Sequence, residues 1–315
     1  MKKELISIIV PCYNEEEMIP LFYYELEKVR ENLTIDIEYY FINDGSDDNT
    51  LKVLRTLAEK DTQRVRYISF SRNFGKESAI YAGLKNVNGD YVAVMDVDLQ
   101  DPPELLPEMY KMIKEEDYDC IGTRRVNREG EPPIRSFFAK KFYRIINRIS
   151  DTEIIDGARD YRLMTRQMVN AILEVNEYNR FSKGIFSWVG FKTKYLEFEN
   201  KKRVAGETAW SFWGLLKYSI DGIVSFSEAP LAIASLIGMS SFIIAIILAF
   251  IVAIRTLIFD DPTSGWTSLV VIVLALGGLQ LFCLGILGKY LGKTFMESKN
   301  RPIYIVKETE KDMKE

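Results

Sequence analysis

The sequence predicts an α/β domain with a mostly parallel sheet, followed by an interfacial helix and two helices that cross a membrane. Three observations predict this class. Short runs rich in β-branched and aromatic residues alternate with helical patterns in the first part of the chain, and polar residues follow each of these runs. Two long uncharged runs lie near the C-terminus. With 315 residues, of which 47% are hydrophobic, the chain can bury one large core or two ordinary ones.

Five short apolar runs are predicted to be strands, and four helical patterns lie between them. The strands are expected at residues 6–10, 39–42, 65–70, 91–95 and 120–122. The helices are expected at residues 18–33, 50–60, 77–87 and 103–115. Strands joined by helical crossovers form a mostly parallel sheet, and such sheets bind ligands at the carboxyl ends of their strands. Polar side chains should therefore gather where these strands end.

A polar cluster follows each of the five predicted strands. The clusters are residues 11–15, 43–48, 71–76, 96–101 and 123–125. One such cluster alone is typical of a turn and a helix N-cap, and Asp101 followed by two prolines is also a good helix start. Five clusters at successive strand ends are instead expected to form one binding crevice.

Asp96 and Asp98 stand two residues apart directly after the fourth predicted strand, with Gln100 beyond them. Their side-chain oxygens favour Mg²⁺ or Mn²⁺ over Zn²⁺. Magnesium is commonly bound by one or two carboxylates together with phosphate oxygens and water. The motif therefore predicts a phosphate-bearing ligand as well as a metal ion.

Composition disfavours several classes of function. The chain has no histidine, which excludes Ser-His and Cys-His catalysis and His-ligated zinc. The formal net charge is −4, which disfavours a nucleic-acid-binding protein. Cys12, Cys120 and Cys283 form no CxxC pair, so they are expected to be reduced packing residues, which suits a cytosolic main domain. No GxGxxG follows the first predicted strand, so a dinucleotide oxidoreductase is poorly supported.

Two uncharged runs, residues 229–254 and 262–288, are long enough to cross a bilayer, because a spanning helix needs roughly 20 apolar residues. A buried core helix is the alternative, but two such runs joined by a short polar loop favour a membrane hairpin with spans at 229–254 and 266–288. Neither run is N-terminal, so neither is expected to be a signal peptide. Lysines and arginines flank the hairpin, whereas its loop contains only Arg255, so the positive-inside rule places the first domain and the C-terminal tail in the cytoplasm.

Residues 210–226 read WSFWGLLKYSIDGIVSF, with Trp210, Trp213 and Leu216 at helical spacing. This pattern predicts an amphipathic helix in the membrane interface, close to the basic residues 201–203. The alternative is an ordinary surface helix packed on the first domain.

Several segments together resemble the family 2 glycosyltransferases with the GT-A fold. They are VPCYNEEE from Val10, NDGSDDNT from Asn43, FSRNFGKESAIYAGL from Phe70, GDYVAVMDVDLQDPPE from Gly89, DYRLMTR from Asp160 and AGETAW from Ala205. Within that family the chain resembles the polyisoprenyl-phosphate glycosyltransferases of the dolichol-phosphate-mannose-synthase-like branch. Its hairpin resembles that of the bactoprenol glucosyltransferases, and the resemblance extends from Ile6 to about Arg301.

The resemblance implies roles for individual residues. Positions that hold the nucleotide are matched by Pro11, Tyr13, Glu15, Asp44 and Asp96. Metal-site positions are matched by Asp98 and Gln100 together with Asp96, and positions that gather phosphates by Arg124, Arg135 and Arg203. The candidate catalytic residues are Asp98 and Asp160, of which Asp160 matches the acidic residue near the reacting centre. Arg159 stands where many relatives have glycine, a departure that bears on the acceptor pocket.

The resemblance also implies the reaction. In this reaction one sugar is transferred, with inversion, from a UDP-sugar to polyprenyl (undecaprenyl) phosphate, and the product serves cell-envelope glycan modification. The sugar expected first is glucose, and N-acetylglucosamine and galactose are the alternatives. Mg²⁺ or Mn²⁺ and the arginines neutralise the departing diphosphate. The acceptor phosphate is already anionic, so no strong general base is required and Asp160 is expected to orient the acceptor or the sugar. The alternative for Asp160 is an ion pair with Arg162 or Arg166 in one helix.

The predicted organisation has four parts. They are a cytoplasmic catalytic domain at residues 1–200, a juxtamembrane segment at 201–228, the membrane hairpin at 229–291 and a cytoplasmic tail at 292–315. A multi-pass protein of the inner or plasma membrane is expected, in contact with the lipid bilayer, and the resemblance implies a homotetramer. Small residues that allow close helix contacts, either between subunits or within the hairpin, are Gly277, Gly278, Gly285 and Gly288.

Two other functions are compatible with the same fold class. A processive polysaccharide synthase typically has a Gln-x-x-Arg-Trp motif and many spans, whereas this chain has no such motif and two predicted spans. A non-catalytic membrane scaffold or transporter subunit is the second alternative. The intact metal and phosphate residues argue against it, and so does the lack of charge inside the predicted spans.

Overall fold

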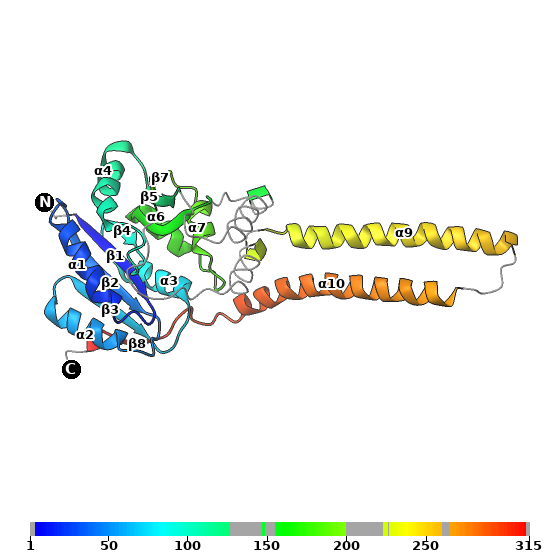
Figure 1. The fold of residues 1–315 in the computed structure, drawn as a ribbon, viewed down its shortest axis with the longest axis horizontal. Helices are drawn as coiled ribbons and strands as arrows, with labels where there is room; N and C mark the ends of the chain where they lie inside the picture. The colour runs from blue at the N-terminus through cyan, green and yellow to red at the C-terminus, as the bar shows by residue number, and fades with distance from the viewer. Residues whose placement is uncertain are drawn as a thin grey trace.

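The computed structural model describes residues 4–126, 147–148, 155–199, 223–225, 227–259 and 265–312. An α/β domain lies at one end of the molecule, and two long helices project from it side by side (Figure 1). The interfacial helix predicted at residues 210–226 lies almost wholly outside the described residues.

Eight strands in the described part of the chain form one mixed sheet, in the order β7-β5-β6-β4-β1-β2-β3-β8. The strands are β1 (Leu5–Cys12), β2 (Asp36–Asn43), β3 (Val65–Phe70), β4 (Tyr91–Val94), β5 (Cys120–Arg125), β6 (Ala158–Thr165), β7 (Thr193–Phe198) and β8 (Val306–Thr309). The neighbours β4, β1, β2 and β3 are parallel, whereas β6 is antiparallel to β4 and β5, and β8 is antiparallel to β3. The carboxyl ends of β1 to β4 therefore lie along one edge of the sheet.

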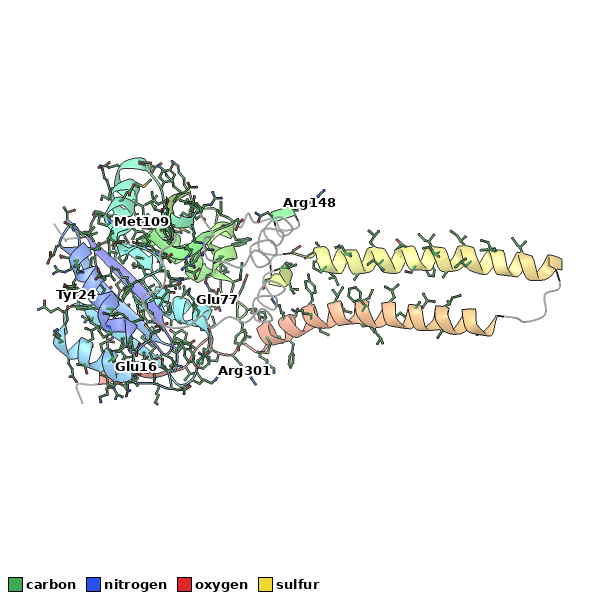
Figure 2. The ribbon with its side chains drawn as sticks, viewed as in Figure 1. Glu16, Tyr24, Glu77, Met109, Arg148 and Arg301 are labelled. Carbon is green, nitrogen blue, oxygen red and sulfur yellow. The ribbon has the colours of Figure 1, made fainter. Side chains whose placement is uncertain are left out.

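Helices cover both faces of this sheet. They are α1 (Met18–Arg30), α2 (Thr50–Lys60), α3 (Lys76–Asn86), η1 (Pro103–Leu105), α4 (Leu106–Glu116), α6 (Arg166–Glu174) and α7 (Ser182–Trp188). Successive strand residues point to opposite faces, so Ile8 packs in the core with α1, α2 and α4, and Ile9 packs in the core with α3, α6 and α7. Figure 2 shows the side chains crowded around the sheet. Burial on both faces explains the nearly continuous apolar sequence of β1.

The five predicted strands are confirmed, and the predicted α/β class with a mostly parallel sheet is confirmed with them. Three further strands, β6, β7 and β8, have no counterpart among the predicted elements. Charged residues interrupt their apolar patterns, which weakens the alternation that identifies a strand. Because Asp160 lies in β6, the alternative of an ion pair within one helix is wrong.

The two projecting helices are α9 (Ala229–Phe259) and α10 (Trp266–Ser298), of 31 and 33 residues. Both begin where the predicted spans begin, and by length and composition both are candidates to cross a membrane. Large apolar side chains along them are exposed, including Leu236 at 67% and Leu281 at 71%. Soluble monomers rarely expose apolar patches of this extent, so the surface is compatible with membrane association.

In the part of the helix pair that the structure describes, the glycines at 277, 278, 285 and 288 of α10 make no contact with α9. A Cβ atom added to Gly277, Gly278, Gly285 or Gly288 would meet no atom within 4 Å. The alternative in which these glycines pack the hairpin against itself is therefore wrong for this structure.

The chain returns to the α/β domain after α10, where β8 pairs with the edge strand β3 (Figure 1). The predicted C-terminal tail is thus partly a strand of the main sheet. The strand β7 precedes the helix pair in the chain and β8 follows it, so one sheet contains strands from both sides of the pair.

Candidate active site

The loops after β1 and β2 are held together by hydrogen bonds. Asn14, which has a φ of 55°, accepts a hydrogen bond from the backbone N–H of Asp47 and donates its own backbone N–H to Ser46, both at 2.9 Å. The backbone N–H of Glu15 donates to Thr50 Oγ1 at 2.8 Å. The first two predicted polar clusters therefore meet at the sheet edge.

Asp44 joins the loop after β2 to the loop after β3. Its carboxylate oxygens accept hydrogen bonds from the backbone N–H groups of Phe74 and Gly75, at 2.6 and 2.8 Å. Burial raises the pKa of Asp44, and the two N–H groups oppose that rise. Each carboxylate oxygen can accept more than one hydrogen bond, so this structural role leaves capacity for the predicted contact with a nucleotide.

Gly45 allows the same two loops to approach closely. Its φ is +65°, and a Cβ atom at this position would lie 2.2 Å from the carbonyl carbon of Arg72. A side chain here would both clash with backbone and occupy a conformation that favours glycine. The glycine of the NDGS segment is therefore required by the geometry of the crevice.

A pocket of about 290 Å³ opens between the ends of β1, β2 and β3. We call it the strand-end pocket, and its lining includes Tyr13, Ser46, Asp47, Ser71, Arg72 and Lys307. The Tyr13 side chain is 44% exposed at its margin, where an aromatic ring can stack on a base. Of the residues predicted to hold a nucleotide, Tyr13 lines this pocket. Pro11 and Glu15 lie two residues from Tyr13 in the chain, and Asp44 lies between the lining residues Asn43 and Gly45.

The centre of the site is an ammonium group between two carboxylates. Lys76, the first residue of α3, forms an ion pair with Asp96 at 2.6 Å and with Asp160. Burial opposes ionisation of Asp160, but the ammonium groups of Lys76 and Lys183 outweigh burial and hold its pKa far below its usual range. Burial also disfavours the charged form of Lys76, but Asp160 and Asp96 raise its pKa well above the ordinary value. Asp160 is therefore an ionised, ion-paired carboxylate and a very weak base near neutral pH.

The segment after Asp96 turns back on itself. Asp98 is 7% exposed and accepts a hydrogen bond from the backbone N–H of Gln100 at 3.1 Å, while Leu99 between them has a φ of 55°. Asp101 is 2% exposed and accepts a hydrogen bond from Arg159 Nε at 2.8 Å. The interpretation of Asp101 as a helix N-cap is wrong, because η1 begins after Pro102 and Asp101 makes no cap hydrogen bond.

Arg159 links this segment to β6. Besides Asp101, its guanidinium donates to Gln100 Oε1 at 3.4 Å. Burial raises the pKa of Asp101 to about 6, and Arg159 opposes the rise. Arg159 thus places a cation next to Gln100 and Asp101.

The residues present fit a divalent cation. Asp96, Asp98 and Gln100 each have a side-chain oxygen that can bind a cation, and among the described residues Asp101 Oδ2 is buried without a hydrogen-bond partner. The Lys76 ammonium between two carboxylates shows that this place favours positive charge. The described residues contain no cluster of three acidic, cysteine or histidine side chains with the spacing of a metal cage. A metal that is shared with phosphate oxygens needs only one or two carboxylates.

Two cations at the centre were not identified from the sequence. Lys76 belongs to the polar cluster at 71–76, but no role was assigned to it. Lys183 on α7 donates to the carbonyl of Ala158 at 3.2 Å, next to Asp160 in β6. Its helix is held against α3 by Glu77, which accepts a hydrogen bond from the backbone N–H of Ser182 at 2.8 Å.

The predicted phosphate-binding arginines are only partly described. Arg124 lies near the end of β5, where its Nε donates to the carbonyl of Asp156 at 3.0 Å and its guanidinium lies 3.6 Å from Glu197. Its side chain is 42% exposed, so it can turn toward a ligand. Arg135 and Arg203 lie outside the described residues.

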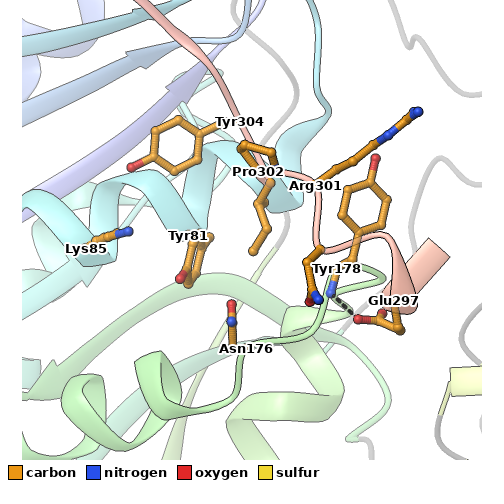
Figure 3. Close-up of a pocket in the computed structure, with 10 residues that line it drawn as sticks. Tyr81, Lys85, Asn176, Tyr178, Glu297, Arg301, Pro302 and Tyr304 are labelled. Atoms are coloured by element: carbon orange, nitrogen blue, oxygen red, sulfur yellow. Dashed lines mark hydrogen bonds between the residues drawn. The ribbon is translucent and has the colours of Figure 1, made fainter. Parts of the chain in front are cut away.

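A second cavity, of about 430 Å³, lies where α10 meets the α/β domain (Figure 3). Tyr81, Tyr178 and Tyr304 line it, and Glu297 of α10 accepts hydrogen bonds from the backbone N–H groups of Tyr178 and Asn179, both at 3.0 Å. These contacts attach the end of α10 to the domain. None of Asp96, Asp98 and Asp160 is among the described residues that line this cavity.

Known proteins resemble this chain over nearly its whole length. Residues 7–173 match the family described as glycosyl transferase family 2. The bactoprenol glucosyl transferase of Shigella phage SfV is 41% identical over 96% of this chain and 98% of its own length. The prophage bactoprenol glucosyl transferase homolog of Escherichia coli (strain K12) is 40% identical over 97% of this chain and 99% of its own length. Among solved structures, glucosyl-3-phosphoglycerate synthase from Mycobacterium tuberculosis is 16% identical over 70% of this chain and 78% of its own, with a TM-score of 0.45.

Proposed function

Because the chain belongs to glycosyltransferase family 2, and is therefore an enzyme with the GT-A fold of that family, we propose that it transfers a single sugar from a UDP-sugar to polyprenyl phosphate. The sugar that we propose first is glucose. The observation that carries the proposal is the acidic centre of Asp96, Asp98 and Asp160 at the strand ends, in a chain that also has a helix pair with an apolar surface. The similarity to bactoprenol glucosyl transferases over almost the full length supports a lipid acceptor.

The donor binds with its nucleoside in the strand-end pocket and its diphosphate toward the acidic centre. Pro11, Tyr13, Glu15 and Asp44 surround the nucleoside in this assignment, and Asp96 lies between the two subsites. Asp98 and Gln100, with Asp96, would hold Mg²⁺ or Mn²⁺, which would neutralise charge on the departing diphosphate. Arg124, Arg135 and Arg203 supply further positive charge to the phosphates, a task for which the planar guanidinium is suited.

The acceptor needs no deprotonation. A phosphate monoester is anionic near neutral pH, and its oxygen attacks the anomeric carbon as the bond from that carbon to the UDP oxygen breaks. Asp160 is a very weak base because Lys76 and Lys183 lower its pKa, so its role is to orient the acceptor or the sugar. Lys76 in turn fixes the orientation of Asp160 and Asp96. A single displacement inverts the configuration, so an α-linked donor gives a β-linked lipid product.

The helix pair supports a membrane arrangement. The protein is a multi-pass membrane protein in this proposal, with α9 and α10 across the bilayer and the α/β domain in the cytoplasm. The attachment of both helix ends to one sheet supports a single side for residues 4–228 and the C-terminal strand. The open surface of the α10 glycines supports contacts between subunits, and we assign a homotetramer from the family resemblance.

The test is transfer of labelled sugar into lipid. Membranes that contain the protein are incubated with labelled UDP-glucose, undecaprenyl phosphate and Mg²⁺ and then extracted with organic solvent. Label should enter the lipid phase, and EDTA or Asp98→Asn should abolish it. Asp117→Asn is the matched control, because Asp117 is exposed at the end of α4. A lack of labelled lipid with UDP-glucose, UDP-N-acetylglucosamine and UDP-galactose would contradict the proposal.

A further inference from the structure

The segment between α10 and β8 is fixed beside the end of β3. The ring of Tyr304 stacks on Phe70 with 4.9 Å between the ring centroids. The backbone N–H of Ser71 donates to the carbonyl of Ile305 at 3.0 Å. The last part of β3 and the loop that follows it therefore pack directly against the C-terminal segment.

β8 itself is anchored by its acidic side chain. Glu308 forms an ion pair with Arg55 of α2 at 2.5 Å and accepts a hydrogen bond from the hydroxyl of Tyr67 at 2.6 Å. These partners lower the pKa of Glu308, so the carboxylate stays charged and the anchor persists near neutral pH. Residues on both sides of Lys307 are thus held in place.

Lys307 brings a positive charge to the strand-end pocket. It is the one residue of the C-terminal segment among the described residues that line this pocket, and the other lining residues come from the first 73 residues of the chain. Its side chain is exposed, and no carboxylate in the described ranges lies within 4 Å of its ammonium group. Arg72, which also lines the pocket, already has partners within the protein: its guanidinium lies 3.9 Å from the centroid of the Phe74 ring and donates a hydrogen bond to the carbonyl of Asn73 at 2.8 Å.

The position of the pocket indicates which part of a ligand Lys307 meets. Lys76, Asp96 and Asp98, the groups suited to a diphosphate and its cation, are absent from the described pocket lining. The pocket lies instead beside Tyr13 and the loop of Asp44. An ammonium group donates hydrogen bonds and accepts none, so at this place it selects the carbonyl or hydroxyl oxygens of a nucleoside.

We infer that Lys307 binds the nucleoside part of the sugar donor, so that the C-terminal strand completes the donor site. This inference rests on the proposed function, and it adds to the donor site a residue that follows the helix pair in the chain. The donor site and the membrane anchor are then parts of one structural unit, because β8 reaches β3 only after the chain has formed α9 and α10.

The test compares Lys307→Met with Lys311→Met in the full-length protein, using uridine and UDP as probes in calorimetric titrations. Lys311 is the control because it is exposed two residues beyond β8 and is absent from the described pocket lining. Lys307→Met should raise the Kd of uridine and of UDP by the same factor, about fivefold to tenfold for one hydrogen bond from a charged donor in an open pocket. Lys311→Met should leave both values unchanged, and Lys307→Arg should retain most of the affinity.

Three results would overturn the inference or its premise. Equal Kd values for wild type and Lys307→Met would show that Lys307 does not contact the donor. A loss of UDP affinity with unchanged uridine affinity would move Lys307 to the phosphates and refute the nucleoside assignment. Failure of the wild-type protein to bind UDP would count against the proposed function itself. Thermal unfolding of each variant distinguishes loss of a contact from loss of the fold.

Discussion

Lys76→Met removes the ammonium group that separates Asp96 from Asp160. Breaking a buried ion pair by removing one partner typically costs about 3–5 kcal/mol. The Lys76 side chain is 41% exposed, so solvent screens part of this interaction, and we expect a loss of about 1–3 kcal/mol in the free energy of unfolding. Thermal unfolding of the purified protein measures that loss.

The same substitution should change the pH dependence of catalysis. In the wild-type enzyme Lys76 and Lys183 keep the pKa of Asp160 far below its usual range, so Asp160 remains charged throughout pH 5–8. Without Lys76, burial and the charge of Asp96 raise the pKa of Asp160, and the carboxylate takes up a proton as the pH falls. The profile of kcat/KM against pH should therefore decline toward pH 5 in Lys76→Met and should lack this decline in the wild type.

The control for Lys76→Met is Lys85→Met on the same helix. Lys85 is exposed at the other end of α3 and lines the cavity near α10. It should retain the wild-type profile and stability. Identical pH profiles for Lys76→Met and the wild type would refute the assignment of Lys76 as the residue that keeps Asp160 charged.

Three further predictions concern the same site. Asp160→Asn should retain partial transferase activity while Asp98→Asn loses nearly all of it, and equal, complete loss in a steady-state transfer assay would indicate that Asp160 is a true base. Burial raises the pKa of Asp101 to about 6 in the folded protein, whereas its pKa in the unfolded chain is about 4. The protonated carboxyl therefore stabilises the fold fully below about pH 4, and this stabilisation is lost as the pH rises through 6. Between these pH values the free energy of unfolding, measured with denaturant, should fall by about 3 kcal/mol because of Asp101, and Asp101→Asn should remove this fall. The same pH dependence in Asp101→Asn and the wild type would contradict the assignment. Gly45→Ala should cost at least about 1–3 kcal/mol of stability because of its positive φ and the 2.2 Å approach to Arg72, and unfolding at the wild-type temperature would contradict that geometry.

The parallel half of the sheet could be predicted from the sequence because its strands are buried on both faces. The runs at Leu5–Cys12 and Val65–Phe70 are nearly continuous in apolar residues, and a turn or a helix start follows each of them. β6 could not be predicted in the same way. Arg159, Asp160 and Arg162 break its apolar pattern. Arg159 and Asp160 form ion pairs with Asp101 and Lys76, and Arg162 lies over the ring of Phe186, so the partners of these charged groups are distant in sequence.

The part of the site that could be predicted from the sequence is the one whose metal-binding residues lie in a single short segment. Asp96, Asp98 and Gln100 are adjacent in sequence, and their oxygen ligands indicate a cation without any structural information. Lys76 lies in the predicted cluster at 71–76, but its pairing with Asp160 could not be predicted, because Asp160 reaches it only through tertiary packing. Lys183 and Lys307 were not identified, since each reaches the crevice only through tertiary packing. Lys307 lies 209 residues after Asp98 in the chain, beyond both projecting helices, and only the pairing of β8 with β3 brings it to the pocket.

The anomeric configuration of the lipid product tests the central claim most directly. The purified enzyme is given a UDP-α-sugar and a short-chain polyprenyl phosphate, and the coupling constant of the anomeric proton is measured by NMR. A single displacement by the acceptor phosphate, with Asp160 orienting the reactants, predicts a β-linked product. An α-linked product would contradict this mechanism and would require a covalent intermediate or a front-side reaction.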